Sequence, residues 1–254
     1  MSDGDDAPPR FCWADLATAD AAAAIRFYGA LFGWRHEDVP VEGAGTYTML
    51  RLDERDVAAL YEADADDESP AHWNAYVCVA DADAATGAAQ ELGATLVAAP
   101  FDVADAGRMA VVRDPAGAVV SVWQPRRHAG AAAAGEPGAF AGAELATPDA
   151  AAAERFYRAL FGWSAVADPD GRVVFEARGR RVAGLYDLAA AGVDDVPPHW
   201  VVQFAVDDCD VAAARVRALG GGVLVEPSEA PAGRVATVHD PHGASFAIVA
   251  ATAA

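Results

Sequence analysis

The chain has 254 residues, of which 54% are hydrophobic and 22% charged, and its formal net charge is −20. This length suits one large domain or two of ordinary size, with enough apolar material for a packed core. A field of this sign repels phosphate backbones and argues against nucleic acid as a partner. No long apolar run predicts a membrane helix, and the acidic opening lacks a signal-peptide core, so we expect a cytoplasmic protein.

The first predicted module begins with an apolar strand at residues 11–17. Thr18 is expected to cap the helix that follows, with Asp20 in its first turn. Gly33 stands where a left-handed C-cap would end that helix. Three short strands are then predicted at residues 34–38, 46–52 and 56–62.

The same pattern restarts within the first half of the chain. A strand at residues 73–79 precedes a helix at 81–92. Asp114-Pro-Ala-Gly117 has the composition of a tight turn between two strands. The strands of this second module are predicted at residues 95–99, 108–112 and 118–123.

The second half of the chain repeats the first. Residues 16–34 recur as residues 145–163 with changes at three positions only, one of which places Pro148 where the first helical residue is expected. His72-Trp73 also recurs, as His199-Trp200. The sequence therefore predicts an α+β chain of four βαβββ modules. The expected division is a disordered acidic tail at 1–9, a first domain at 10–125, a flexible linker at 126–138 and a second domain at 139–250.

This organisation resembles the vicinal oxygen chelate superfamily of glyoxalases, bleomycin-resistance proteins and extradiol dioxygenases. The resemblance rests on Phe27-Tyr28 followed by Leu31-Phe32-Gly33-Trp34, on Val79-Ala-Asp81-Ala-Asp83, and on the closing Gly-Arg-x-Ala and Asp-Pro-x-Gly-Ala segments. It covers nearly the whole chain and is strongest with the two-domain bacterial subgroup called hydroxylase-like or glyoxalase-like. It implies two tandem domains with cupped mixed sheets that bind small molecules.

The resemblance also implies a divalent metal in a cup between two paired modules, held by His, Gln or Glu from the first and last strand of each module. Indole, glycine, valine and alanine side chains cannot ligate a metal, and Asn and Ser are poor ligands for transition metals. We therefore expect no metal and no other cofactor at the usual site. The implied ligand positions, carried over by spacing, are Trp13, Asn74 and Ser121 in the first half and Gly142, Val201 and Ala247 in the second.

A displaced metal site is the alternative, because strand side chains alternate between faces. If Trp13 faces the cup, so does Asp15, and Glu144 matches it in the second half. An Asp15/His72 or Glu144/His199 pair could hold a metal or act as acid and base. The competing interpretation places both histidines at the rim and pairs both carboxylates with arginine.

A metal-free cup would suit a small, partly aromatic ligand. Trp13, Tyr76 and Trp123 would line it, unless they are plain core residues. Arg108 and Arg234 could bind a ligand carboxylate, or could brace their hairpins by pairing with Asp114 and Asp240. The remaining wall positions are His72, Asn74, Ser121, His199 and Gln203.

Three functions remain open at this stage. We favour a small-molecule-binding protein, and the alternative is a glyoxalase-, isomerase- or dioxygenase-like enzyme that uses a displaced metal or a carboxylate base. A purely structural role is the third. Cys12, Cys78 and Cys209 are expected to be free thiols, the first two as buried apolar residues. A monomer or a homodimer is expected, and whether modules pair within or across the halves stays open.

Overall fold

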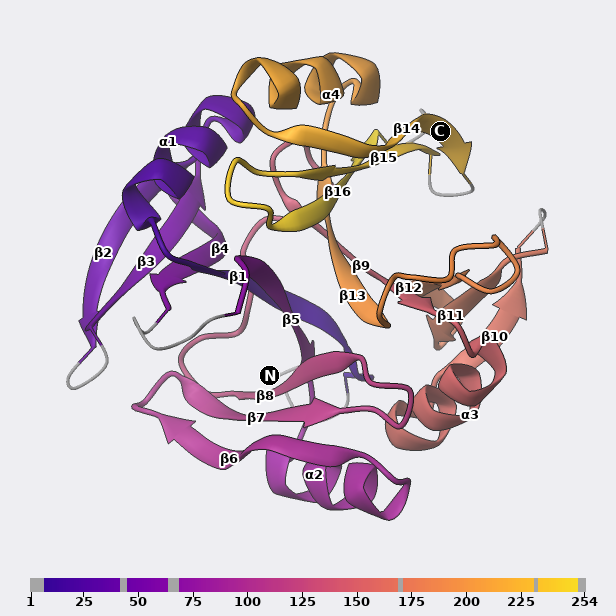
Figure 1. Cartoon of the computed structure of the whole chain (residues 1–254). Helices are drawn as coiled ribbons and strands as arrows, with labels where there is room; N and C mark the ends of the chain where they lie inside the picture. The colour runs from indigo at the N-terminus through magenta and orange to yellow at the C-terminus, as the bar shows by residue number, and fades with distance from the viewer. Residues whose placement is uncertain (1–6, 42–44, 64–68, 169–170, 231–232, 251–254) are drawn as a thin grey trace. The chain divides into compact units, whose positions relative to one another are not determined.

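The computed structural model describes residues 7–41, 45–63, 69–168, 171–230 and 233–250. It confirms the predicted βαβββ modules in both halves (Figure 1). The first half contains β1 (Arg10–Thr18), α1 (Ala21–Phe32), β2 (Arg35–Val41), β3 (Gly45–Leu52), β4 (Arg55–Glu62), β5 (His72–Cys78), α2 (Ala82–Glu91), β6 (Thr95–Val103), β7 (Gly107–Arg113) and β8 (Val119–Pro125).

The second half repeats this order. It contains β9 (Phe140–Thr147), α3 (Ala150–Phe161), β10 (Ser164–Ala167), β11 (Val173–Ala177), β12 (Arg180–Asp187), β13 (His199–Ala205), α4 (Cys209–Ala218), β14 (Gly222–Ala230), β15 (Gly233–His239) and β16 (Ser245–Ala250). Among the described residues, no helix is long and apolar enough to span a membrane.

Each half forms one eight-stranded mixed sheet. The strand orders are β2-β3-β4-β1-β5-β8-β7-β6 and β10-β11-β12-β9-β13-β16-β15-β14. The first strand of each module runs parallel to its last, as β1 does to β4, whereas the consecutive strands between them are antiparallel. In Figure 1, α2 lies against β6 to β8 and α4 against β14 to β16.

The helix starts differ from the prediction by two residues. Asp20, not Thr18, caps α1, because its carboxylate accepts a hydrogen bond from the Ala23 amide at 2.8 Å. Thr18 still belongs to β1, where it pairs with Glu62. In the repeat Asp149 is the cap, which places Pro148 before the helix rather than at its first position. The left-handed C-cap predicted at Gly33 is confirmed, with φ of 77°.

The chain divides into two compact units, each of which contains one module from each half. The first unit comprises the described residues up to Cys12 together with 75–130 and 142–201. At its core the Tyr157 hydroxyl donates to the Asp114 carboxylate at 2.9 Å and accepts from the Trp200 indole at 3.0 Å. All three side chains are buried.

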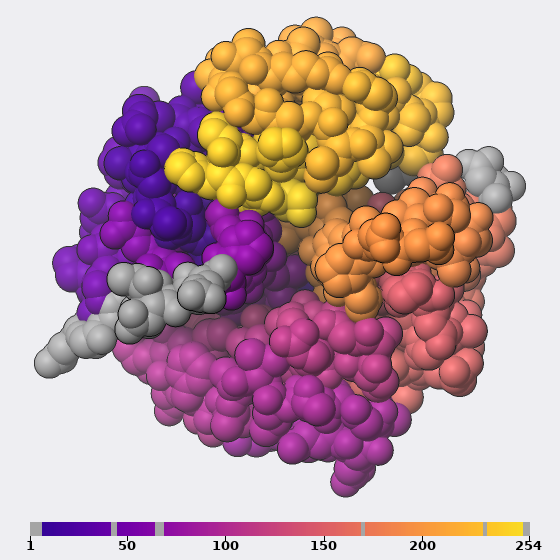
Figure 2. Space-filling view, in the orientation of Figure 1, coloured from indigo at the N-terminus to yellow at the C-terminus, as the bar shows by residue number. Residues whose placement is uncertain are grey.

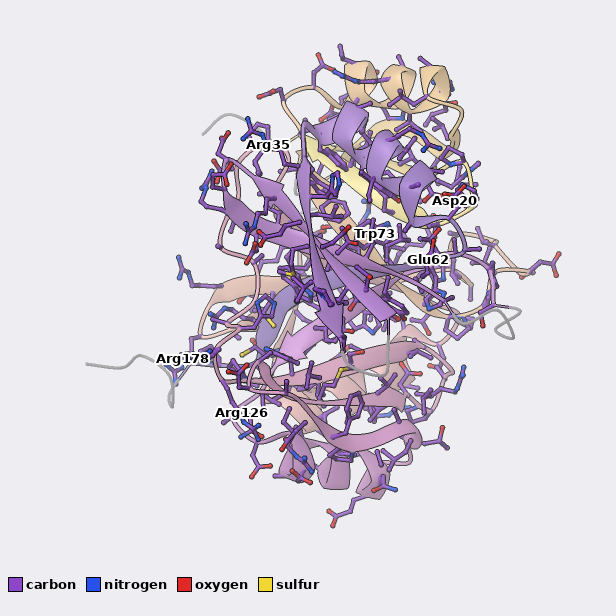
Figure 3. All side chains as sticks on the ribbon, turned by 90° about the vertical axis from the view of Figure 1, so that its left-hand side faces the viewer. Asp20, Arg35, Glu62, Trp73, Arg126 and Arg178 are labelled. Carbon is purple, nitrogen blue, oxygen red and sulfur yellow. The ribbon has the colours of Figure 1, made fainter. Side chains whose placement is uncertain are left out.

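The second unit comprises residues 13–74, 131–141 and the described residues from 202 onward. Its core repeats the same chain of hydrogen bonds, from Trp73 to Tyr28 at 3.0 Å and from Tyr28 to Asp240 at 3.1 Å. Phe204 contacts aromatic rings from the first half, including Trp34 at 5.1 Å between centroids. Figure 3 shows Trp73 in the interior, whereas Arg35 lies at the periphery. Modules far apart in sequence therefore share a core.

The surface of the last module shows how its helix is oriented. The inward face of α4 consists of small or apolar residues, among them Cys209, Ala213 and Val216. Its other face is exposed and carries Asp210 and Val211, and the helix lies at the surface in Figure 2. The helix is thus held by one apolar stripe, as expected for a helix packed on a sheet.

Residues 126–138, the segment predicted as a flexible linker, form hydrogen bonds near their start and near their end. The amides of Arg126 and His128 donate to the Ala106 carbonyl within the first unit. In the second unit the Glu136 carboxylate accepts from the Arg55 guanidinium at 3.0 Å. The acidic residues 1–6 of the predicted tail lie outside the described residues.

Candidate functional site

A buried carboxylate anchors a polar cluster in the second unit. Asp15 on β1 is 2% exposed, and it accepts hydrogen bonds from the Tyr47 hydroxyl at 2.9 Å and the Asn74 amide at 3.0 Å. The Tyr47 hydroxyl in turn accepts from the Trp13 indole at 3.0 Å. The Asn74 amide also reaches the Tyr61 hydroxyl at 3.3 Å. We call these five residues the Asp15 cluster.

Two tyrosines bring aromatic surface to this cluster. The rings of Tyr47 on β3 and Tyr61 on β4 lie nearly parallel, with centroids 6.5 Å apart. Both residues and Asn74 are half-buried, whereas Trp13 is buried. Burial, followed by the charge of Asp15, raises the pKa of the Tyr47 phenol well above its ordinary value. Tyr47 therefore remains a neutral donor to Asp15 at physiological pH.

His72 contacts the backbone just before its own strand rather than the Asp15 cluster. Its ring nitrogen Nδ1 is 2.9 Å from the Pro70 carbonyl oxygen, and the residue is exposed at the start of β5. It lines a cavity of about 230 Å³ with Thr18, Ala63 and His242. His199 repeats this contact, with Nδ1 2.8 Å from the Pro197 carbonyl oxygen. These positions agree with the rim interpretation of both histidines.

Glu144 occupies the position of Asp15 in the first unit, in different surroundings. Burial is the main cause that raises the pKa of its carboxyl, and the charges of Arg181 and Arg172 partly oppose this effect. Gly184 stands opposite Glu144 in the register of β12 and β9. A Cβ atom at Gly184 would lie 2.6 Å from the Glu144 carboxylate, so glycine leaves room for the longer acid.

The strand registers show why the two acids differ. Asp15 pairs with Ala59, which pairs with Met49, and Glu144 pairs with Gly184, which pairs with Val174. Two residues before Met49 and Val174, the chain has Tyr47 and Arg172 respectively. A tyrosine hydroxyl at this position therefore donates to Asp15, whereas at the equivalent position of the repeat an arginine charge acts on Glu144. Sequence reasoning missed Tyr47, Tyr61, Arg172 and Arg181, because none of them lies on the strand that carries Asp15 or Glu144.

The other predicted wall residues are divided between the units. In the first unit Tyr76 stands opposite Ser121 in register, and both are buried. Trp123 is buried too, and its indole donates to the His128 carbonyl at 2.8 Å. In the second unit Gln203 stands opposite Ala247.

The two predicted arginines have partners other than those expected. Arg108 donates to both carboxylate oxygens of Asp83, at 2.6 and 2.9 Å, and also bonds Asp102. Arg234 does the same with Asp210 in the repeat. The expected pairing with Asp114 and Asp240 is wrong, because those carboxylates accept from tyrosine hydroxyls and from their own turn amides. Each arginine instead ties its strand to the first turn of the neighbouring helix.

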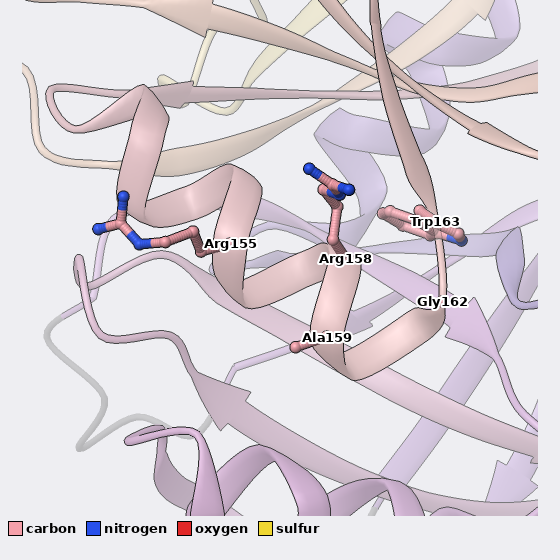
Figure 4. A pocket seen from close by; sticks show the side chains of 5 residues that line it. All are labelled: Arg155, Arg158, Ala159, Gly162 and Trp163. Atoms are coloured by element: carbon pink, nitrogen blue, oxygen red, sulfur yellow. The ribbon is translucent and has the colours of Figure 1, made fainter.

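An open hollow of about 400 Å³ lies beside α3 in the first unit (Figure 4). It is lined by Arg155, Arg158 and Trp163, among others. Arg158 bonds Glu154 one turn earlier at 2.9 Å, and Arg155 points away from the Trp163 ring in Figure 4. The Trp163 indole donates to the Pro9 carbonyl at 2.7 Å. These side chains do not converge on one point, so this hollow is a weaker candidate than the Asp15 cluster.

The donor groups do not fit the metal that the resemblance implies. Within the part of the chain that the structure describes, no three His, Cys, Asp or Glu side chains come together as a possible ligand set. The one carboxylate of the Asp15 cluster is accompanied by an amide, two phenols and an indole. The cluster lacks the two histidines that accompany one carboxylate in non-haem iron(II) sites, and an indole has no free lone pair to offer a metal.

Comparisons with known proteins support this fold and give it relatives. The sequence model of the Glyoxalase/Bleomycin resistance protein/Dioxygenase superfamily matches residues 10–122 and 139–248. The Anthracycline biosynthesis protein DauV of Streptomyces sp. (strain C5) is 38% identical and covers 96% of this chain and 94% of its own. CFP32 of Mycobacterium tuberculosis (strain CDC 1551 / Oshkosh), provisionally called a glyoxylase, is 39% identical with 93% of both chains covered.

Solved structures resemble the chain at lower identity. The 2,3-dioxygenase LapB from Pseudomonas sp. KL28 has a TM-score of 0.65 at 15% identity, covering 96% of this chain and 92% of its own. The Mn(II)-bound glyoxalase from Novosphingobium aromaticivorans has a TM-score of 0.64 at 15% identity, covering 94% and 81% respectively. At such identity the likeness concerns the fold alone.

Proposed function

Because the chain belongs to the glyoxalase/bleomycin resistance protein/dioxygenase superfamily, we propose that it binds a small, partly aromatic molecule at the Asp15 cluster without a resident metal. The observation that carries this proposal is the cluster itself. A single buried carboxylate accepts hydrogen bonds from Tyr47 and Asn74, which connect it to Trp13 and Tyr61 respectively. Such a set of groups supplies aromatic walls and one strong acceptor, which is how small-molecule sites fix a planar ligand.

The chemistry of the cluster defines the class of ligand. An ionised carboxylate only accepts hydrogen bonds, so a ligand hydroxyl would donate to Asp15 beside Tyr47 and Asn74. The half-buried rings of Tyr47 and Tyr61 lie nearly parallel and offer faces for stacking. We therefore expect a planar phenol rather than a flexible or highly charged molecule.

The relatives agree with this ligand class. Two curated relatives, DauV and DnrV, are named as anthracycline biosynthesis proteins. Anthracyclines are planar polycyclic phenols, so a cluster of tyrosines around a carboxylate matches their chemistry. We propose the same ligand class for this chain, and we propose no particular compound. The roles predicted for Tyr76, Ser121, Trp123, His199 and Gln203 remain proposals, as do a cytoplasmic location and a monomeric or dimeric state.

Titration of the protein with a hydroxyanthraquinone, monitored by isothermal titration calorimetry, tests the proposal. The variants Asp15→Asn and Tyr61→Ala should each weaken binding, the first by about 10-fold or more, since hydrogen bonds to charged groups are worth roughly 1.5–3 kcal/mol. Tyr186→Ala is the matched control. Tyr186 pairs with Ala146 as Tyr61 pairs with Ala17 in the repeat, so its loss should not change affinity.

Metal analysis of the same protein distinguishes the alternatives. We expect no retained transition metal after purification without a metal-affinity tag. One ion held per chain at stoichiometric level would contradict the metal-free part of the proposal. Equal affinities of wild type, Asp15→Asn and Tyr61→Ala for the probe would refute the location of the site.

Glu144 favours a second candidate function, proton transfer in an isomerase- or glyoxalase-like reaction. A half-buried carboxyl whose pKa is raised is better matched to accept a proton near neutral pH than an exposed one. Turnover of an α-hydroxy carbonyl substrate, abolished in Glu144→Gln and insensitive to EDTA, would support this function. Full turnover by Glu144→Gln would exclude it.

A further inference from the structure

Two of the three cysteines lie on neighbouring strands of the first sheet. They are Cys12 on β1 and Cys78 on β5, and the interaction between the two thiols shifts the pKa values of both. The Cys12 thiol also lies 3.6 Å from the carbonyl oxygen of Tyr76, two residues before Cys78. Both cysteines are free thiols in this structure, and neither contributes to the Asp15 cluster.

The two thiols are in unequal environments. Cys12 is buried and Cys78 is half-buried, so a small oxidant reaches Cys78 more readily. The hydrogen bond from Cys12 is the main cause that lowers the pKa of the Cys78 thiol to about 7, and the positive charge of Arg10 adds to it, against the effect of burial. Cys12, as the donor, has a pKa well above its ordinary value. A thiolate and a protonated thiol therefore sit side by side near neutral pH.

The backbone closes over the buried partner. Gly130 has a φ of 104° and approaches Cys12 so closely that a Cβ atom there would lie 2.5 Å from the Cys12 carbonyl oxygen. The segment that follows β8 thus covers Cys12 on this side. Cys78 stands opposite Trp123 in the register of β5 and β8. An oxidant is therefore expected to meet Cys78 first.

We propose that Cys12 and Cys78 form a redox-reactive dithiol that a hydroperoxide converts to an intramolecular disulfide. The Cys78 thiolate attacks the terminal peroxide oxygen, so that an S–O bond forms, the O–O bond breaks and the alkoxide or hydroxide leaves as it takes up a proton. Cys12 then attacks the Cys78 sulfenic sulfur, the S–S bond forms, and the S–O oxygen leaves as water with the Cys12 proton. Two thiols are oxidised by two electrons, and one hydroperoxide is reduced to an alcohol or water, plus water.

Strand geometry permits the closure. Neighbouring strands lie about 4.7–4.9 Å apart, and a disulfide requires Cβ atoms about 3.5–4.5 Å apart. Rotation of the two side chains with a small backbone shift therefore brings the sulfurs together. Because the Cys12 thiol already lies 3.6 Å from the Tyr76 carbonyl oxygen on β5, no rearrangement of the sheet is needed.

The test uses the full chain, reduced and desalted, with hydrogen peroxide as the probe. After treatment and unfolding, two of the three thiols should resist alkylation. The intact mass should fall by about 2 Da, as loss of two hydrogens requires. A non-reducing peptide map should show Cys12 linked to Cys78, and dithiothreitol should restore all three thiols. The extent of reaction should not depend on protein concentration.

Single serine variants separate the roles of the two sulfurs. Cys209 lies in the other unit, with a thiol pKa raised to about 11 chiefly by burial, so Cys209→Ser should behave as wild type. Cys12→Ser should stop at a sulfenic acid on Cys78, trapped by dimedone. Cys78→Ser should keep both remaining thiols open to alkylation. Three unreacted thiols in wild type, under conditions that oxidise N-acetylcysteine, would overturn the proposal, and so would disulfides formed only between chains.

Discussion

At the scale of single residues, the duplicated halves differ most at one equivalent pair of acids. Asp15 accepts hydrogen bonds from Tyr47 and Asn74. In the repeat, Val201 takes the place of Asn74, so the amide donor is lost. The side chain of Glu144 is one methylene longer than that of Asp15, and the positive charge of Arg181 acts on it in place of an amide donor. The same backbone therefore presents a hydrogen-bonded carboxylate in one unit and a desolvated one in the other.

The raised pKa of Glu144 makes stability depend on pH. Its folded-state pKa lies above its unfolded value, so the stabilisation is complete below about pH 4.3 and is lost as pH rises through the folded-state pKa. We expect Glu144→Gln to lack this loss, because glutamine has no charge to desolvate. Urea unfolding of both proteins at a series of pH values measures it. A difference between the two unfolding free energies that stays constant with pH would contradict this assignment, and exposed Glu62→Gln serves as the control.

At the scale of elements, a buried tyrosine joins α1 to the turn between β15 and β16. The Tyr28 hydroxyl donates to Asp240 and accepts from Trp73, and all three side chains are buried. Asp240 also accepts from the Ala244 amide in its own turn at 3.0 Å. Because the first unit repeats the arrangement with Tyr157, the two helices are fixed in the same way.

Replacing Tyr28 with Phe should reduce the free energy of unfolding by about 1–3 kcal/mol, since a buried indole donor and a carboxylate oxygen lose their partner. Tyr157→Phe should have a similar effect. Tyr186, which is 41% exposed, provides the control, and Tyr186→Phe should change stability by less than about 0.5 kcal/mol. Guanidinium denaturation followed by circular dichroism gives the three values. No loss in either buried variant would show that these hydrogen bonds are energetically neutral.

At the scale of the whole molecule, neither compact unit is made of consecutive chain. The second unit joins residues 13–74 to those from 202 onward, and the first unit joins 75–130 to 142–201. Each half therefore contributes part of the core of both units. The domain boundaries predicted from the repeat therefore describe the two sheets and the duplicated sequence. They do not describe the two compact units.

Cutting the chain between its halves should not release them. A protease site inserted after Gly135, which is exposed, would separate the two sheets in sequence while leaving the contacts of Tyr28 with Asp240 and of Tyr157 with Asp114 in place. We expect the cleaved fragments to co-elute in size-exclusion chromatography and to separate only in denaturant. Separate elution under native conditions would contradict the shared cores.

Much of the fold could be predicted from the sequence because its signals are local. The glycine that ends α1, the alternation along β1 and β5 and the duplicated helix motif all depend on residues close in the chain. The predicted N-cap at Thr18 lies two residues early, because pairing with Glu62 extends β1 through Thr18. The sequence places Asp15 and Asn74 on the same wall, but it does not indicate that Tyr47 bonds Asp15.

The sequence by itself determined four βαβββ modules, because these follow from periodicity and repeats, and its motifs resemble those of the superfamily whose model matches the chain. Only the tertiary structure decided that α1 shares a core with α4, that Tyr47 bonds Asp15 and Tyr61 bonds Asn74, and that the strand of Cys12 lies beside the strand of Cys78. It also decided that Arg108 pairs with Asp83 rather than with Asp114. The physical reason is common to all of these: the partner of a side chain depends on strand register and module packing between segments remote in the chain.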